Sequence, residues 1–135
     1  MTCETIKMEL TANPDYVGII RLTTSGIANK IGFSIDDIED LKVAVSEACT
    51  NAIKHSKDKK FTITFNILEN GINIEIKDNG QGYDINSIST PNLEEPKESG
   101  LGLFIIQALM DDVSMESEAG QGTIIKMTKY LGVDF

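Results

Sequence analysis

Strict alternation of apolar and polar residues in the middle of the chain is the feature that most constrains its fold. Two alternating stretches flank Glu69-Asn70-Gly71, which is typical of a tight turn between paired strands. The apolar positions are Phe61, Ile63, Phe65 and Ile67 before the turn, and Ile72, Ile74 and Ile76 after it. Successive side chains of a strand point to opposite faces, so this hairpin has one apolar face that other elements have to cover.

The rest of the chain supplies elements of both kinds. Short alternating stretches predict further strands, and helical spacing of apolar residues predicts helices. The predicted elements are strands over 6–13, 61–67, 72–76, 113–118 and 123–130, and helices over 13–32, 34–55 and 101–110. The apolar face of the first helix is expected to comprise Val17, Ile20, Leu22, Ile27 and Ile31. This order predicts an α+β fold in two layers, with helices packed on one face of a mixed, mostly antiparallel sheet.

Length and charge bound the organisation of the chain. Its 135 residues suffice for one domain with its own apolar core, so we expect a single domain over 1–135. With 12 basic and 21 acidic residues the net charge is -9, which opposes binding to a phosphate backbone and favours partners with a basic surface. We therefore expect no direct contact with nucleic acid.

The cysteines and the start of the chain indicate a compartment. Cys3 and Cys49 form no CxxC motif and no Cys/His cluster, which fits a reduced setting. The first residues lack a signal-peptide pattern, and no apolar run approaches the roughly 18 residues needed to cross a bilayer. We expect a cytoplasmic protein that does not enter a membrane.

Glu47 and Asn51 form the first candidate site. They stand four apart in the second predicted helix, so their side chains lie on one face, with Lys54 and His55 one turn further on. An amide oxygen suits a hard cation such as Mg²⁺, and a carboxylate can accept a proton from an attacking hydroxyl. For an isolated pair, a solvated polar face is the commoner explanation, and a histidine at a helix end can simply satisfy terminal carbonyls.

Two glycine-containing segments are the next candidates. Asp78-Asn-Gly80-Gln-Gly82 follows an apolar strand, where a carboxylate can accept a hydrogen bond from an exocyclic amine such as that of adenine. Gly100-Leu-Gly102-Leu precedes a helix whose free backbone amides can hold phosphate. Taken singly, an ordinary Asp/Gly turn and an ordinary helix start explain these two segments as well.

Two further features lie outside these segments. Residues 83–99 are polar, contain Pro91 and Pro96, and show no periodicity, as expected of a functional or disordered loop. Arg21 lies among apolar residues of the first helix, where an arginine either anchors a protein partner or extends to water.

The three segments, in this order, resemble the N, G1 and G2 boxes of the GHKL ATPase superfamily. Longer stretches, over 16–23, 38–52 and 109–113, are similar to a narrower family within it, the RsbW-type anti-sigma factors that are also serine-protein kinases. Anti-sigma-F factors are similar but more distant. The resemblance covers nearly the whole chain and implies the Bergerat ATP-binding sandwich, with residues 83–99 as its ATP lid.

The resemblance also implies a role for each candidate residue. Glu47 is expected as the general base for a serine hydroxyl, Asn51 as the Mg²⁺ ligand, and Asp78 as the carboxylate that reads adenine. The other residues expected near ATP are Lys54 and His55, Gly80 and Gly82 along the base, Ser99, Gly100, Leu101 and Gly102 at the phosphates, and Thr123 on the far side of the adenine.

The partners that the resemblance implies are proteins. A homodimer is expected to hold a sigma-B-like sigma factor when ATP is bound, with Arg21 near the partner surface. A competing anti-anti-sigma protein with a STAS domain is expected to be inactivated by phosphorylation on serine. Two alternatives remain at this point: an ATP-gated anti-sigma binding module without kinase activity, and a stand-alone ATPase domain of the histidine-kinase type.

Overall fold

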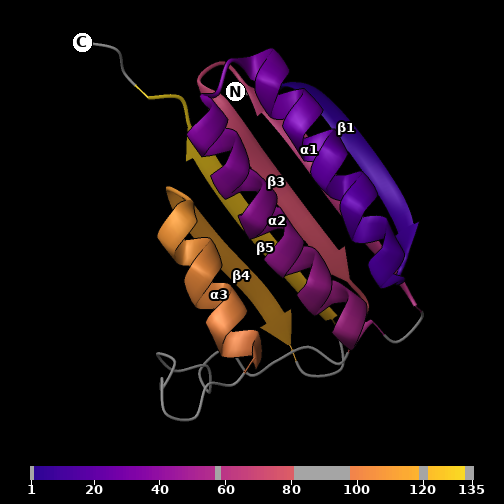
Figure 1. Cartoon of the computed structure of the whole chain (residues 1–135). Helices are drawn as coiled ribbons and strands as arrows, with labels where there is room; N and C mark the ends of the chain where they lie inside the picture. The colour runs from indigo at the N-terminus through magenta and orange to yellow at the C-terminus, as the bar shows by residue number, and fades with distance from the viewer. Residues whose placement is uncertain (1, 57–58, 81–97, 119–121, 133–135) are drawn as a thin grey trace.

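Helices cover one face of a five-stranded sheet in the computed structural model (Figure 1). The structure describes residues 2–56, 59–80, 98–118 and 122–132. The strands are β1 (Thr2–Thr11), β2 (Lys60–Leu68), β3 (Gly71–Asp78), β4 (Asp112–Glu118) and β5 (Gly122–Tyr130). The helices are a short 3-10 turn (Pro14–Tyr16), α1 (Val17–Ile31), α2 (Ile35–His55) and α3 (Glu98–Leu109).

The strand order in the sheet is β1-β2-β3-β5-β4. All of these neighbours pair antiparallel. The predicted hairpin is present, with Phe65 opposite Ile74 and Leu68 opposite Gly71 at the turn. The prediction of an α+β sandwich is thus confirmed, but the described strands contain no parallel pair, since β3 and β5 run in opposite directions where a mixed sheet was expected.

The core lies between the sheet and the helices. The alternating residues of β2 and β3 face it, and Ile63, Phe65 and Ile74 are fully buried there. α2 contributes a row of mostly small residues, all at most 2% exposed: Leu41, Ala44, Val45, Ala48, Cys49 and Ala52. No helix in the described part of the chain is both long and apolar enough to cross a membrane.

Helix ends follow the signals in the sequence. The Asn13 side chain accepts a hydrogen bond from the backbone N–H of Asp15 at 2.9 Å, and Ser34 Oγ accepts one from the N–H of Asp37 at 3.2 Å. Gly32 ends α1 with φ of 108°, a left-handed conformation that favours glycine. These caps fix where α1 stops and α2 begins.

Two predicted details were wrong. Leu22, expected in the core, is 76% exposed, because it lies about 160° around α1 from the buried Thr24. The last residues of the predicted lid, Glu98 and Ser99, belong to α3. Helix formation propagates more easily than it starts, and the apolar stretch that follows extends the helix back over them. The remainder of that predicted lid, 83–97, lies outside the described residues.

We expect Leu41→Ala to lower the free energy of unfolding by about 2–5 kcal/mol, because it removes a fully buried side chain from the centre of the core. Leu22→Ala makes the same chemical change at an exposed position, and we expect it to change stability by less than about 0.5 kcal/mol. Urea denaturation followed by circular dichroism measures both. Similar losses in the two variants would contradict this description of the core.

Candidate functional site

Glu47 and Asn51 lie on the side of α2 that faces the start of α3. Both side chains are half-buried. A methyl group added to Gly102 would lie 3.2 Å from Glu47 Oε2 and 3.5 Å from Asn51 Nδ2. Glycine at this position therefore lets α3 approach the acid and the amide closely, and it brings two of the candidate segments side by side.

The end of β3 lies directly beneath the end of α2. Asp78 is 6% exposed, and its Oδ1 accepts a hydrogen bond from the backbone N–H of Gly80 at 2.8 Å. A methyl group on Gly80 would overlap the carbonyl oxygen of His55. The glycine is required for this close approach, which holds the carboxylate at the same end of the sheet as the acid and the amide.

Thr123 lies beside Asp78 on the neighbouring strand. The register of β3 and β5 places the two residues opposite each other, and Thr123 is 2% exposed. Its hydroxyl lies 2.9 Å from Ser117 Oγ on β4. Gly122 has φ of 89°, and a methyl group there would overlap the carbonyl oxygen of Asp78. A polar row thus crosses three strands where the apolar rows of the core end.

A cavity of about 240 Å³ opens at this polar row. Its lining combines carboxylates, hydroxyls and a lysine: Lys77, Asp78, Glu116, Ser117, Gly122, Thr123 and Ile124. A few convergent polar groups in a concave site are typical of small-molecule binding. Lys77, Glu116 and Ile124 alternate with Asp78, Ser117 and Thr123 along the three strands, so their side chains point to the open face of the sheet. The cavity therefore lies around the strand ends beside Asp78 and Thr123, and none of the described residues of α2 or α3 lines it.

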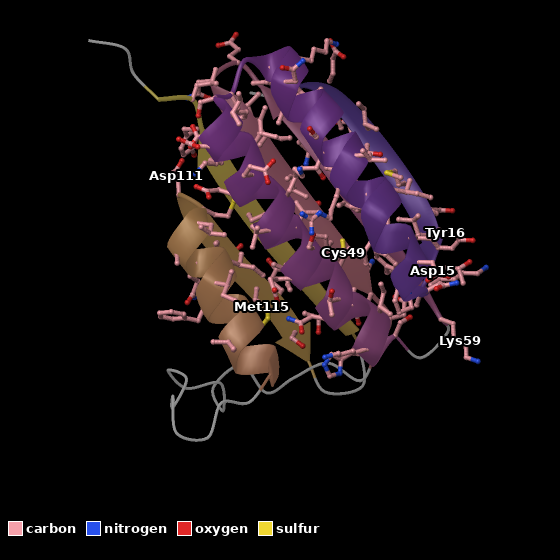
Figure 2. All side chains as sticks on the ribbon, viewed as in Figure 1. Asp15, Tyr16, Cys49, Lys59, Asp111 and Met115 are labelled. Carbon is pink, nitrogen blue, oxygen red and sulfur yellow. The ribbon has the colours of Figure 1, made fainter. Side chains whose placement is uncertain are left out.

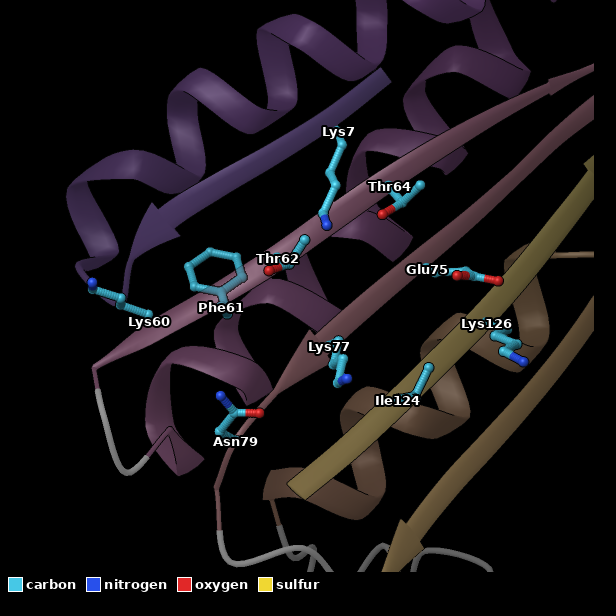
Figure 3. Close-up of a pocket in the computed structure, with 10 residues that line it drawn as sticks. All are labelled: Lys7, Lys60, Phe61, Thr62, Thr64, Glu75, Lys77, Asn79, Ile124 and Lys126. Atoms are coloured by element: carbon cyan, nitrogen blue, oxygen red, sulfur yellow. The ribbon is translucent and has the colours of Figure 1, made fainter. Parts of the chain in front are cut away.

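A second, larger hollow of about 420 Å³ lies on the open face of the sheet (Figure 3). It is lined by lysines and polar residues from four strands and from the end of β3: Lys7, Lys60, Phe61, Thr62, Thr64, Glu75, Lys77, Asn79, Ile124 and Lys126. None of the predicted site residues that the structure describes is among them. Size alone therefore does not identify the functional site in this protein.

Lys129 joins the far ends of α2 and α3. Its Nζ donates to the carbonyl oxygen of Leu109 at 2.8 Å and lies 3.9 Å from Asp37 Oδ1 in the first turn of α2. A cation at a helix C-terminus and an acid at a helix N-terminus both complement the helix dipoles. At the turn after α3, Asp111 accepts a hydrogen bond from the N–H of Tyr130 (Figure 2). These contacts hold α3 at the end opposite the candidate site.

The other predicted residues divide into three groups. Leu101 lies half-buried in α3, and Ser99 and Gly100 belong to its first turn. Lys54 is exposed and His55 half-buried at the end of α2. Arg21 is separate from all of these, because α1 and α3 lie on opposite sides of α2 (Figure 1). Gly82 lies outside the described residues.

Cys49 is a packing residue of α2. It is free and fully buried, and burial raises the pKa of its thiol to about 12. A thiol with this pKa carries almost no thiolate at neutral pH, and the thiolate is the reactive form. The cysteine between Glu47 and Asn51 thus serves the core and takes no part in the chemistry of the site.

The chain matches the family model of the histidine kinase-like ATPase domain over residues 10–129. It is 41% identical to the serine-protein kinase RsbW of Halalkalibacterium halodurans, over 97% of this chain and 86% of that protein. It is 46% identical to the serine-protein kinase RsbW of Oceanobacillus iheyensis, over 93% and 86% of the two chains. The chain belongs to the RsbW family of histidine kinase-like ATPases. The resemblance noted in the sequence is thereby confirmed.

Solved structures share the RsbW fold. The crystal structure of the RsbU and RsbW domains of a Mycobacterium tuberculosis protein matches with a TM-score of 0.72 at 21% identity, over 95% of this chain and 32% of that longer chain. The histidine kinase domain of a blue-light activated histidine kinase from Erythrobacter litoralis matches with a TM-score of 0.55 at 17% identity, over 90% and 62%. At these identities the likeness extends to the fold alone.

Sequence reasoning missed two residues of this RsbW-family chain. Ser117 was not a candidate, although pairing the last two predicted strands about their glycine turn places it opposite Thr123. Nothing in the sequence indicated that Lys129 is buried, because a lysine in an alternating strand usually faces solvent. In the structure it is 8% exposed. The surroundings of both residues come from other elements: Ser117 lies opposite Thr123 on β5, and Lys129 contacts Leu109 and Asp37 of the helices.

We expect Gly80→Ala to destabilise the fold by about 1–3 kcal/mol, because the added methyl group overlaps the His55 carbonyl and the backbone has to move. Gly26→Ala is the matched control, since that glycine lies in α1 with open space around its Cβ position. We expect it to stabilise the protein by about 0.5–1 kcal/mol. Thermal denaturation compares the two variants, and a stable Gly80→Ala protein would show that the close approach is not needed.

Proposed function

We propose that the protein is an ATP-dependent serine-protein kinase that phosphorylates an anti-anti-sigma protein and, with ATP bound, holds a sigma factor. Family membership supports the kinase activity, since the relatives are serine-protein kinases by name. The single observation that carries the proposal is the meeting of Glu47, Asn51 and Gly102 on facing sides of α2 and α3. This proximity supports a site in which Glu47 would act as the base, Asn51 would bind the metal and the start of α3 would bind phosphate.

ATP is proposed to span the distance from the sheet end to α3. Asp78 and Thr123 would bind the base on the helix-facing side of the strand ends, with Gly80 close to it. The backbone at the start of α3 would bind the phosphates, because the first amides of a helix have no partner within the helix. Gly82, Ser99, Gly100 and Leu101 are proposed to complete this path, with Lys54 and His55 beside it.

The residues around Asn51 fit a magnesium ion. Mg²⁺ prefers oxygen ligands and commonly takes one or two from the protein and the rest from phosphates and water. Asn51 supplies a side-chain amide close to Gly102 and beside the Glu47 carboxylate, so an amide oxygen and a carboxylate oxygen are available near the start of α3. When bound, Mg²⁺ would neutralise charge on the phosphates. Among the described residues, no group of three or more His, Cys, Asp and Glu is placed to hold a metal.

Glu47 is proposed as the base for the reaction. Its half-buried carboxylate would accept the proton of the serine hydroxyl as the hydroxyl oxygen forms its bond to the γ-phosphorus, and the bond from that phosphorus to the leaving oxygen of ADP breaks. In-line phosphoryl transfer depends mainly on positioning and charge neutralisation. The packing of α2 on the core supplies the positioning, since its inward residues are fully buried.

The partner surface is proposed to lie on α1. Arg21 is half-buried there, and the nearby Ile19 and Leu22 are 48% and 76% exposed. Exposed apolar residues beside an arginine are a composition found in protein interfaces. We propose that the sigma factor and the anti-anti-sigma protein compete for this region and that the protein acts as a homodimer.

We expect Glu47→Gln to retain ATP binding and to lower phosphate transfer by about a hundredfold or more, since the amide cannot accept the hydroxyl proton. The measurement follows γ-³²P from ATP to the anti-anti-sigma protein purified from the same host. Glu39→Gln is the control, because that side chain lies on the same helix about two turns before Glu47, is 57% exposed and pairs with Lys42 at 2.9 Å.

Three outcomes of this measurement differ in meaning. Transfer by the Glu39→Gln variant and not by Glu47→Gln supports the proposed base. Normal transfer by Glu47→Gln excludes it. No transfer by the unaltered protein to its verified partner, with ATP and sigma-factor binding intact, would identify an ATP-gated binding module in place of a kinase.

A further inference from the structure

Thr123 lies between Asp78 and Ser117 in the polar row at the end of the sheet. The register places Asp78 opposite Thr123 and Thr123 opposite Ser117, so that β3, β5 and β4 contribute one residue each. Two residues back along the strands, the same face carries core residues such as Ile76 and Ile125. The polar row therefore belongs to the helix-facing side of the sheet.

The hydroxyl protons of this row have one assignment that uses both observed contacts. Ser117 Oγ lies 3.3 Å from the carbonyl oxygen of Gly122, which can only accept, and 2.9 Å from Thr123 Oγ1. Ser117 has a single proton, which it donates to Gly122. Thr123 then donates its own proton to Ser117 and directs it toward β4, away from Asp78.

With this assignment, Asp78 on β3 and Thr123 on β5 both act toward a ligand only as hydrogen-bond acceptors. With its proton engaged by Ser117, the buried Thr123 hydroxyl offers a ligand only lone pairs. A carboxylate also only accepts, and the Gly80 N–H fixes the orientation of Asp78. An amino group with two N–H donors matches a pair of acceptors. A carbonyl oxygen in the same place would meet two acceptors and leave them unsatisfied, which is costly in a buried site.

We propose that Ser117 sets the nucleobase specificity of this site, because it takes the Thr123 proton and thereby makes Thr123 an acceptor. The pair formed by Thr123 and Asp78 selects a purine with an exocyclic amine, as in ATP, over one with a carbonyl oxygen at that position, as in GTP. Ser117 is a positioning residue, since it acts through Thr123. The inference rests on the proposed function in one respect: the base of the nucleotide lies against Asp78 and Thr123.

The test compares the dissociation constants of ATP and GTP by isothermal titration calorimetry on the whole chain. Ser117→Ala frees the Thr123 hydroxyl to rotate and donate to a carbonyl, so the preference for ATP over GTP falls about three- to tenfold, the effect of roughly one hydrogen bond. Ser117→Thr keeps a hydroxyl at this place and retains the preference. Thr123→Val removes the acceptor, so ATP binds more weakly without any gain for GTP.

The outcomes separate this inference from the proposed function. An unchanged ratio of the two constants in Ser117→Ala overturns the role of Ser117 while ATP binding stands. Failure of the unaltered chain to bind either nucleotide overturns both proposals. Should Ser117→Ala not fold, Ser117→Cys gives the same comparison, because a thiol is a much weaker donor and acceptor of similar size.

Discussion

The packing of α2 against the sheet is the constraint on which the rest of this structure depends. α2 contacts α1, α3, β2, β3 and β5. Its small buried residues, Ala44, Ala48 and Ala52, let the neighbouring elements come close. Because the inward side of α2 is fixed by the core, the adjoining side that carries Glu47 and Asn51 is fixed toward α3. The same packing thus stabilises the fold and orients the proposed catalytic residues.

The two ends of the helical layer are held by different kinds of contact. At one end, Lys129 joins the termini of α2 and α3 through Leu109 and Asp37, with little exposure to water. At the other end, Gly102 lets α3 approach Glu47, and Gly80 lets the chain after β3 pass close to the His55 carbonyl oxygen. The helical layer is thus held by Lys129 at one end and packed closely through glycines at the other, where the nucleotide is proposed to bind.

Local patterns predicted most of the fold, and the role of the three candidate segments stays a prediction. The alternation over 61–76 determines the hairpin register, and Asn13, Gly32 and Ser34 determine helix ends, because each acts through its own neighbours in sequence. Ser117 and Lys129 escaped prediction because their partners lie on other elements. The exposure of Leu22 did not follow from its apolar neighbours in sequence, because its position about 160° around α1 from the buried Thr24 decides which face it lies on.

The proposed nucleotide site lies at the helix-facing end of the sheet and not in the larger hollow of the open face. Backbone amide chemical shifts recorded while a non-hydrolysable ATP analogue and Mg²⁺ are added test it most directly. The account predicts the largest changes at Asn51, Asp78, Gly80, Gly102 and Thr123. Changes centred on the open-face residues Lys7, Thr64 and Lys126, with none at the first five, would contradict it.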